Sequence, residues 1–248
     1  MSALIANLLA VLSISIIIAV SISPVWSCTC QKRHPQQYVC DANFVFRGKV
    51  LGKSPFQSAT SLPGQFEYQI QVQRVFKDQV DGGIGRKVKL ITPASEALCG
   101  VPELTQSKTY LITGEVIDGQ MYLSVCNWVA EWQSVTRPQR QGIKHLYMKH
   151  CTNCMVRIES PSPVSHPLPQ GPLDYFHGCT YTSYTHLSIG IADCEASYAS
   201  CVQNHNRGCG WLSNHGYQEC LEKRNVVLQQ LTDNQKFHLN AIDHGGNW

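Results

Sequence analysis

The sequence predicts a mainly β protein with flanking helices, in which a small five-stranded barrel precedes a small disulfide-rich module. Segments rich in β-forming residues follow one another between residues 44 and 125, separated by turns that carry Gly and Pro. All 12 cysteines lie after residue 27. They divide evenly, with six from Cys28 to Cys151 and six from Cys154 to Cys220. This even division indicates two separately cross-linked modules.

Residues 1–27 are predicted to be a signal peptide. Residues 4–20 are almost wholly apolar, and a short, more polar exit ends in the small residue Ser27. We therefore place cleavage between Ser27 and Cys28. The alternative is a transmembrane anchor, but about 17 apolar residues is at the short limit for spanning a bilayer. We expect no membrane span, and secretion to the extracellular space or extracellular matrix, where cysteines form disulfides.

The barrel strands are predicted from hydrophobic periodicity. Residues 66–73 alternate apolar and polar side chains with a period of two, as a half-buried strand does. Asp118-Gly119 lies between two apolar runs and is a strong hairpin signal. The predicted strands are 44–51, 66–73, 88–92, 110–117 and 121–125. A short helix is expected from Pro35 to about residue 42, because proline suits a first helical turn, and a second helix is expected around 143–147.

The predicted domains follow from these patterns. Residues 28–153 form the first domain, and residues 154–220 form the cysteine-rich module, with a proline-rich linker or loop at 160–172. Residues 221–248 form a polar tail. The tail is either a weakly amphipathic helix through Leu221, Leu228 and Leu231 or a loose segment.

Charge and motifs exclude several function classes. The net charge is +3 and the basic residues are scattered, which could help retention on acidic matrix polymers but is not a nucleic-acid footprint. The sequence contains no zinc-protease, serine-hydrolase or phosphate-loop motif, and its carboxylates are dispersed. We therefore expect no catalytic site and no enzyme.

An ordered set of motifs gives the sequence a specific resemblance. The set comprises Cys28, Cys30, His34-Pro35-Gln36 and Cys40, then Thr92-Pro93-Ala94 with Cys99-Gly100, then Leu111-Ile112, Asp118-Gly119 and Cys126, then Trp132 with Gln139-Arg140-Gln141-Gly142. In this order the residues closely resemble the tissue inhibitors of metalloproteinases. Lys32, where the family usually has proline, and Gln31, where an apolar residue is commoner, depart from the pattern. The second module matches poorly beyond Cys154 and Cys209-Gly210-Trp211, and Cys220 is additional.

The resemblance implies a fold and a mechanism. The barrel would be of the oligonucleotide-binding (OB-fold), netrin-like type, without a nucleic-acid role, since fold alone does not set function. The protein would have no cofactor of its own. Mature Cys28 would bind the catalytic zinc of the target through its α-amino nitrogen and carbonyl oxygen, with Thr29 in the specificity pocket. The other expected contacts are Cys30, Gln31 at the rim, Ala97, Leu98 and Cys99. The expected partners are matrix metalloproteinases and related metzincins, with the extracellular matrix as a further candidate.

The resemblance also implies disulfide pairs. In the family pattern Cys28 pairs with Cys99, Cys30 with Cys126, and Cys40 with Cys151. The other six cysteines allow 15 pairings, of which only Cys154–Cys209 is favoured. These six are Cys154, Cys179, Cys194, Cys201, Cys209 and Cys220.

Alternative interpretations stay open at this stage. The same barrel could serve a non-inhibitory matrix-binding protein. Cys151 and Cys154 have the spacing of a thiol oxidoreductase, although disulfides with other cysteines are favoured in a secreted chain. A zinc site could be drawn from Cys201, His205, Cys209, His215 and Cys220. For His34-Pro35-Gln36, a helix start that packs is favoured over a ligand role.

Overall fold

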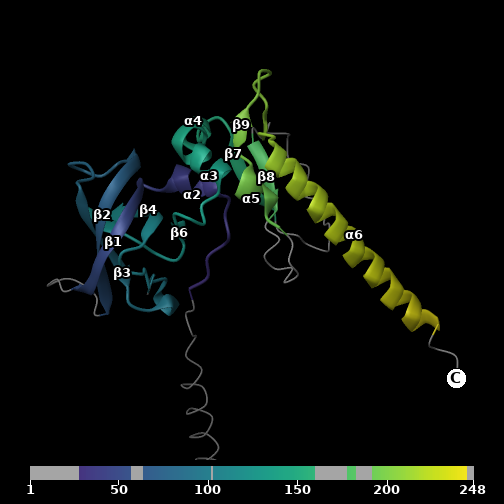
Figure 1. The fold of residues 1–248 in the computed structure, drawn as a ribbon, viewed down its shortest axis with the longest axis horizontal. Helices are drawn as coiled ribbons and strands as arrows, with labels where there is room; N and C mark the ends of the chain where they lie inside the picture. Colours follow the sequence, from purple (N-terminus) through teal and green to yellow (C-terminus); the bar gives the residue numbers. More distant parts are fainter. Residues whose placement is uncertain (1–27, 57–63, 102, 160–177, 183–191, 245–248) are drawn as a thin grey trace, which may run out of the picture.

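The computed structural model of the protein describes residues 28–56, 64–101, 103–159, 178–182 and 192–244. The predicted signal peptide and the proline-rich segment lie outside the described residues. Figure 1 shows the barrel strands on one side, the C-terminal module on the other, and helix α6 extending away from the module. No helix in the described ranges is both long enough and apolar enough to cross a bilayer.

The barrel is a ring of antiparallel strands with one parallel contact. The strands are β1 (Phe44–Phe56), β2 (Gln65–Asp78), β3 (Lys87–Pro93), β4 (Thr109–Ile117), β5 (Gln120–Tyr122) and β6 (Val129–Glu131). Their order is β1-β2-β3-β5-β4-β6, and pairing of β1 with β4 closes the ring. The predicted mainly β fold with a closed five-stranded barrel is confirmed. The sequence analysis missed β6, because three residues are too few to show a period.

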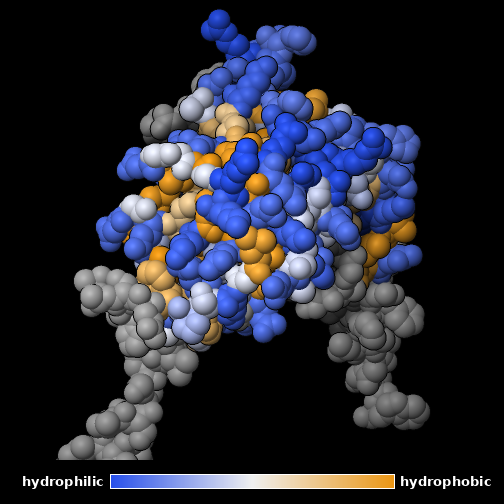
Figure 2. Space-filling view, turned by 60° about the vertical axis from the view of Figure 1, so that its left-hand side comes forward, coloured by the Kyte–Doolittle hydropathy of each residue, from blue (hydrophilic) through white to orange (hydrophobic). Residues whose placement is uncertain are grey.

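The period of two places large side chains inside the barrel. Phe44 and Phe46 of β1 stack with ring centroids 5.6 Å apart, and Tyr68 and Ile70 of β2 are fully buried beside them. Gly114 of β4 makes room for this packing, because a Cβ there would lie 2.3 Å from the Phe44 ring and 2.5 Å from a backbone oxygen. On the face seen in Figure 2, polar residues cover most of the surface and apolar ones form small separate patches.

Helices cover one side of the barrel. Helix α2 (Pro35–Asp41) starts at a capping box, in which the His34 side chain accepts from the α2 backbone and Gln37 bonds back to the His34 backbone. The chain is also helical through α3 (Arg137–Gln141), η2 (Gly142–Leu146) and α4 (Tyr147–His150), which contains the helix expected around 143–147. These helices bury Val39, Ile143 and Tyr147 against the outer side of β1 and β4, as a second apolar cluster.

The C-terminal module is built on short pairs of strands and two helices. Strand β7 (Met155–Glu159) pairs in parallel with β8 (Gly178–Thr182), and β9 (Cys201–Gln203) pairs with β10 (Cys209–Trp211). Helix α5 (Cys194–Tyr198) packs on α6 (His215–His244). The three bridges of the module are Cys154–Cys209, Cys179–Cys201 and Cys194–Cys220.

The tail is helical, and its helix begins earlier than residue 221. The Asn214 side chain accepts a hydrogen bond from the Tyr217 backbone at 3.0 Å, and a side-chain acceptor at this position favours a helix start. Cys220 therefore lies within α6, and its bridge to Cys194 ties the helix to α5. The boundary expected at residue 220 falls inside this helix.

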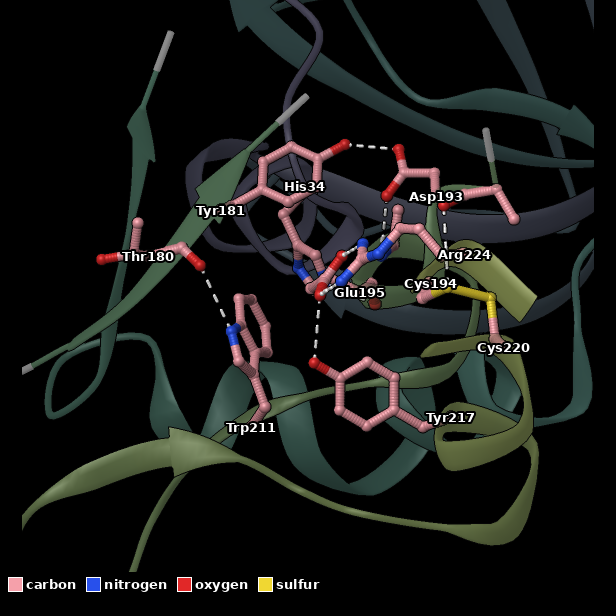
Figure 3. A network of polar contacts seen from close by, with 12 residues as sticks. His34, Thr180, Tyr181, Asp193, Cys194, Glu195, Trp211, Tyr217, Cys220 and Arg224 are labelled. Carbon is pink, nitrogen blue, oxygen red and sulfur yellow. Dashed lines mark hydrogen bonds and ion pairs between the residues drawn. A yellow bond between two sulfur atoms is a disulfide. The ribbon is translucent and has the colours of Figure 1, made fainter. Parts of the chain in front are cut away.

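The two modules meet around a buried polar element at the start of α2. His34 is fully buried, and its Nδ1 accepts from the Gln36 backbone. Nε2 therefore carries the proton and donates to the Glu195 carbonyl at 3.0 Å. The Gln36 side chain bonds both the N–H and the carbonyl of Cys201, at 2.9 and 3.0 Å. Figure 3 shows His34 beside Tyr181, Trp211 and Glu195 of the second module. The helix-start and packing interpretation of His34-Pro35-Gln36 is thus confirmed.

Replacing Gly114 by alanine is expected to destabilise the barrel. The added Cβ would meet the Phe44 ring and the Tyr122 carbonyl oxygen, and the backbone cannot move without disturbing β5. We expect the free energy of unfolding in denaturant titrations to fall by about 2 to 3 kcal/mol, as in other overpacked cores. Gly52→Ala is the matched control, because nothing lies within 4 Å of its Cβ position and a change within about 0.5 kcal/mol is expected. Equal losses in both variants would contradict this account.

The buried His34 predicts a loss of stability in acid. Burial lowers the pKa of His34 from 6.5 to about 4, although Asp193 and Glu195 offset part of this effect. Between these two pKa values the unfolded chain binds a proton that the folded protein excludes. His34 therefore contributes a fall of roughly 3 kcal/mol in the free energy of unfolding as the pH drops from about 6.5 to about 4.

His34→Asn tests this assignment, because asparagine can still cap α2. The variant should be less stable at pH 7 but should lose roughly 3 kcal/mol less between pH 7 and pH 4. Denaturant titrations across this range measure the difference. Parallel pH profiles for the two proteins would show that His34 is not the responsible group.

Candidate functional site

The first residues after the predicted cleavage point form an extended segment that is tied to the barrel twice. Residues 28–34 have no regular secondary structure. The structure contains the Cys28–Cys99 and Cys30–Cys126 bridges, each with Cα atoms 5.2 Å apart. The two bridges lie against each other, since the Cys28 sulfur is 3.9 Å from that of Cys30. Thr29 is therefore held between two covalent attachments.

A tight loop supports Cys28 from the barrel side. The one-turn helix η1 (Glu96–Leu98) is capped by Ser95 and ends at Cys99, which adopts a left-handed conformation with φ of 64°. At Gly100 a Cβ would lie 1.9 Å from the Pro93 carbonyl oxygen, so only glycine permits this turn. The loop presents the Ala97 carbonyl, which accepts a hydrogen bond from the Cys28 backbone nitrogen at 3.2 Å. The position of that nitrogen is thus fixed by a bridge and a hydrogen bond.

The segment and the loop together form an exposed ridge. The residues called the ridge below are Cys28, Thr29, Cys30, Gln31, Ala97, Leu98 and Val125. Thr29, Gln31 and Ala97 are exposed, and Leu98 is 62% exposed. The ridge therefore presents small, polar and apolar side chains to solvent beside two disulfides.

Val125 belongs to the ridge, although the sequence analysis placed it at the end of a strand. Its backbone N–H donates to the Cys99 carbonyl at 2.9 Å, and its side chain is 40% exposed. Strand β5 ends at Tyr122, so Val125 lies in the turn before Cys126. Val125 directly precedes Cys126, which bridges to Cys30, and this position in the sequence could have identified it as part of the ridge.

The sulfur atoms at the ridge do not form a metal site. Those of Cys28, Cys30 and Cys126 lie within 4.8 Å of one another, and the described ranges contain no other such group of three. All three are in disulfides, so none can supply the thiolate that a metal requires. With the sulfur in a disulfide, the backbone carbonyl oxygen of Cys28 remains as a ligand atom, and its nitrogen could become one only as a free α-amino group.

The disulfides also decide between the alternative interpretations of the cysteines. Cys151 pairs with Cys40 and Cys154 with Cys209, so these two cysteines do not form the dithiol of an oxidoreductase. The zinc interpretation of Cys201, Cys209 and Cys220 is likewise wrong, because each lies in a bridge. No cysteine in the described residues is free.

Comparisons with known proteins agree with this arrangement. The family model described as tissue inhibitor of metalloproteinase matches residues 26–211. Metalloproteinase inhibitor 3 of Scyliorhinus torazame is 34% identical over 134 residues, which are 53% of this chain and 59% of that protein. Metalloproteinase inhibitor 3 of Gallus gallus is 30% identical over 75% of this chain and 81% of its own length.

A human relative matches a larger share of this chain. Metalloproteinase inhibitor 2 of Homo sapiens is 25% identical over 204 residues, which are 79% of this chain and 86% of that protein. The family model covers both the ridge and the strands of the C-terminal module. This chain therefore belongs to the tissue inhibitor of metalloproteinase family.

Proposed function

We propose that this chain is a secreted inhibitor of zinc metalloendopeptidases, and not an enzyme, with the free α-amino group of mature Cys28 as its central ligand. The matrix metalloproteinases and related metzincins are the proposed targets. The observation that supports this proposal most is the fixed position of the Cys28 backbone at an exposed ridge, between the Cys99 bridge and the Ala97 carbonyl. The relatives named metalloproteinase inhibitors point the same way.

The chemistry follows from the state of the amine. A catalytic zinc keeps three protein ligands and one open position. An α-amino group has a pKa of about 7.7 to 8, so a modest electrostatic pull is sufficient to deprotonate it near neutral pH. The neutral nitrogen and the adjacent carbonyl oxygen of Cys28 can then act as a chelating pair. Before the signal peptide is removed this nitrogen is an amide and a poor donor, so cleavage after Ser27 is the activating step.

The ridge supplies the remaining contacts in this proposal. Thr29 is exposed between the two bridges and would enter the specificity pocket of the target. Ala97 and Leu98 would lie alongside, together with Val125, and Gln31 would contact the rim. Because the bridges fix Cys28 and Cys30 before binding, less conformational entropy is lost in the complex than with a free N-terminal segment.

Localisation is part of the same proposal. A chain whose six described disulfides leave no cysteine free fits an oxidising compartment, and the apolar residues 4–20 fit a secretory signal. The extracellular space or matrix, where the proposed targets act, is the expected location.

A single extra residue before Cys28 is expected to abolish most inhibition. In a mature protein that begins with an added alanine, the Cys28 nitrogen becomes an amide and loses its donor lone pair. We expect the inhibition constant against a matrix metalloproteinase cleaving a fluorogenic peptide to rise at least about 100-fold, equivalent to about 2.7 kcal/mol. The protein that begins at Cys28 is the control. Equal potency of both forms would reject the chelating amine, and inactivity of both against several metzincins would favour the matrix-binding alternative.

Substitutions at Thr29 and Gln31 should separate pocket contact from rim contact. Thr29→Ala removes a methyl and a hydroxyl group from the pocket, and burial of such a group contributes about 1 kcal/mol. The inhibition constant should therefore rise about 5-fold. Gln31→Ala, two residues along the same segment, should change it less than about 2-fold because a rim contact contributes little. The reverse order of effects would show that the segment docks in a different register.

A further inference from the structure

Lys32 follows the ridge directly and makes its ion pair with the other module. Its ammonium lies 2.8 Å from Asp193 Oδ2, and Asp193 immediately precedes α5. Because the two residues belong to different modules, this ion pair links the modules. The resemblance to the family assigns no role to Lys32, because the family usually has proline at this position.

Asp193 is a preorganised partner. Its Oδ1 accepts from the Ala196 backbone at 3.2 Å and so caps α5, while Oδ2 accepts from the Tyr181 hydroxyl at 2.6 Å. Figure 3 shows this carboxylate between Tyr181 and the buried network around Glu195. The Asp193 side chain is 16% exposed, against 41% for Lys32. Since the acceptor is already fixed, only Lys32 becomes ordered when the pair forms.

The segment that carries Lys32 is short and held at both ends. Cys30 is bridged to the barrel, and His34 is buried between the modules, so three residues connect the two anchors. Arg33 is fixed toward α2 by its ion pair with Asp41 and by a backbone hydrogen bond to the Tyr38 hydroxyl. Of the three residues between the anchors, Lys32 is the one whose side chain pairs with Asp193.

The ridge side of this segment has few contacts of its own. Thr29 and Gln31 are exposed, and none of the hydrogen bonds between described residues involves either of them. Their order therefore depends on what holds their neighbours, which are two bridged cysteines for Thr29, and bridged Cys30 and Lys32 for Gln31. Cys30 is held by its bridge, and Lys32 by Asp193.

We propose that Lys32 is a positioning residue for inhibition, through which Asp193 of the C-terminal module holds the segment around Thr29 in its binding conformation. The inference rests on the proposed function of the ridge. In this arrangement the second module strengthens inhibition without touching the target. Lys32 acts by ordering the ridge before the complex forms, which lowers the entropy lost on binding.

The test uses the full mature protein that begins at Cys28, with inhibition measured against a matrix metalloproteinase catalytic domain. Asp193→Asn removes the charge but keeps an acceptor for the α5 backbone, and Lys32→Gln removes the other charge. Each should raise the inhibition constant about 3- to 10-fold, within the range expected when a partly exposed ion pair is lost. The double variant should be no worse than either single one, because both remove the same interaction. Lys32→Arg should retain most of the potency.

Three further measurements distinguish an ordering effect of Lys32 on the ridge from a general disturbance of the fold. Lys108→Gln breaks an exposed lysine–glutamate pair on the barrel and should leave the inhibition constant unchanged. At about 1 M salt, where screening extends to about 3 Å, the ratio between Asp193→Asn and the unaltered protein should fall toward one. In the free protein, NMR relaxation should show larger backbone motion at Thr29 and Gln31 in both charge variants.

The possible outcomes have distinct meanings. If Lys32→Gln weakens inhibition and Asp193→Asn does not, Lys32 contacts the target directly and the inference is overturned. Unchanged relaxation at Thr29 in both variants overturns it as well. If the unaltered protein inhibits none of several metalloproteinases, the proposed function fails, and the relaxation measurement still decides whether Asp193 orders the segment.

Discussion

The Cys28–Cys99 and Cys30–Cys126 bridges are the constraint on which the functional surface depends. They join residues 71 and 96 positions apart, so the ridge is built from segments that are distant in the sequence. In the chain-entropy model each loop of this length removes about 4 to 5 kcal/mol of freedom from the unfolded chain. The bridges also place the segment from Cys28 to Cys30 beside the η1 loop. The barrel is in this sense a rigid support for a segment that has no secondary structure of its own.

A second constraint fixes how the two modules dock. His34 and Gln36 leave none of their side-chain nitrogen and oxygen atoms unused at the interface. His34 Nδ1 accepts from the Gln36 backbone at the start of α2, and the other atoms bond backbone groups of the second module. A shifted docking would bury these groups without partners, at about 1 to 3 kcal/mol for each. The buried Arg224–Glu195 pair, at 2.6 and 2.8 Å, ties α6 to the same region. Buried pairs of this kind contribute more to a unique arrangement than to net stability.

The sequence predicted the barrel well because its signals are local. Apolar runs rich in β-formers, the period of two at 66–73 and the Asp118-Gly119 turn located β1 to β5 to within a few residues at most ends, although β1 and β2 each extend about five residues beyond the expected strands. Both strands continue past their buried faces into exposed residues, where no hydrophobic pattern marks the end. The positions of Thr29, Ala97 and Leu98 on one ridge followed from the resemblance. Val125 was missed because its apolar character fitted a strand equally well.

The second module was less predictable for physical reasons. Its strands are three to five residues long, too short for a clear period, and its cysteines gave no spacing that selects one pairing among 15. The start of α6 depends on a cap at Asn214 and a bridge at Cys220, which the apolar pattern from Leu221 onward does not reveal. The Lys32–Asp193 contact joins residues far apart in sequence, and neither residue is unusual by itself.

The two kinds of attachment at the ridge differ in how they respond to conditions. Disulfides hold Cys28 and Cys30 at every ionic strength, whereas an ion pair that is partly exposed weakens as salt screens it. Covalent clamps alone leave Thr29 and Gln31 free to fluctuate about fixed neighbours, because a bridge restrains the cysteine and not the residue beside it. An additional contact immediately after Gln31 acts on this residual freedom. Under the proposal made above, the barrel determines where the ridge is, and the C-terminal module determines how rigid it is when a target arrives.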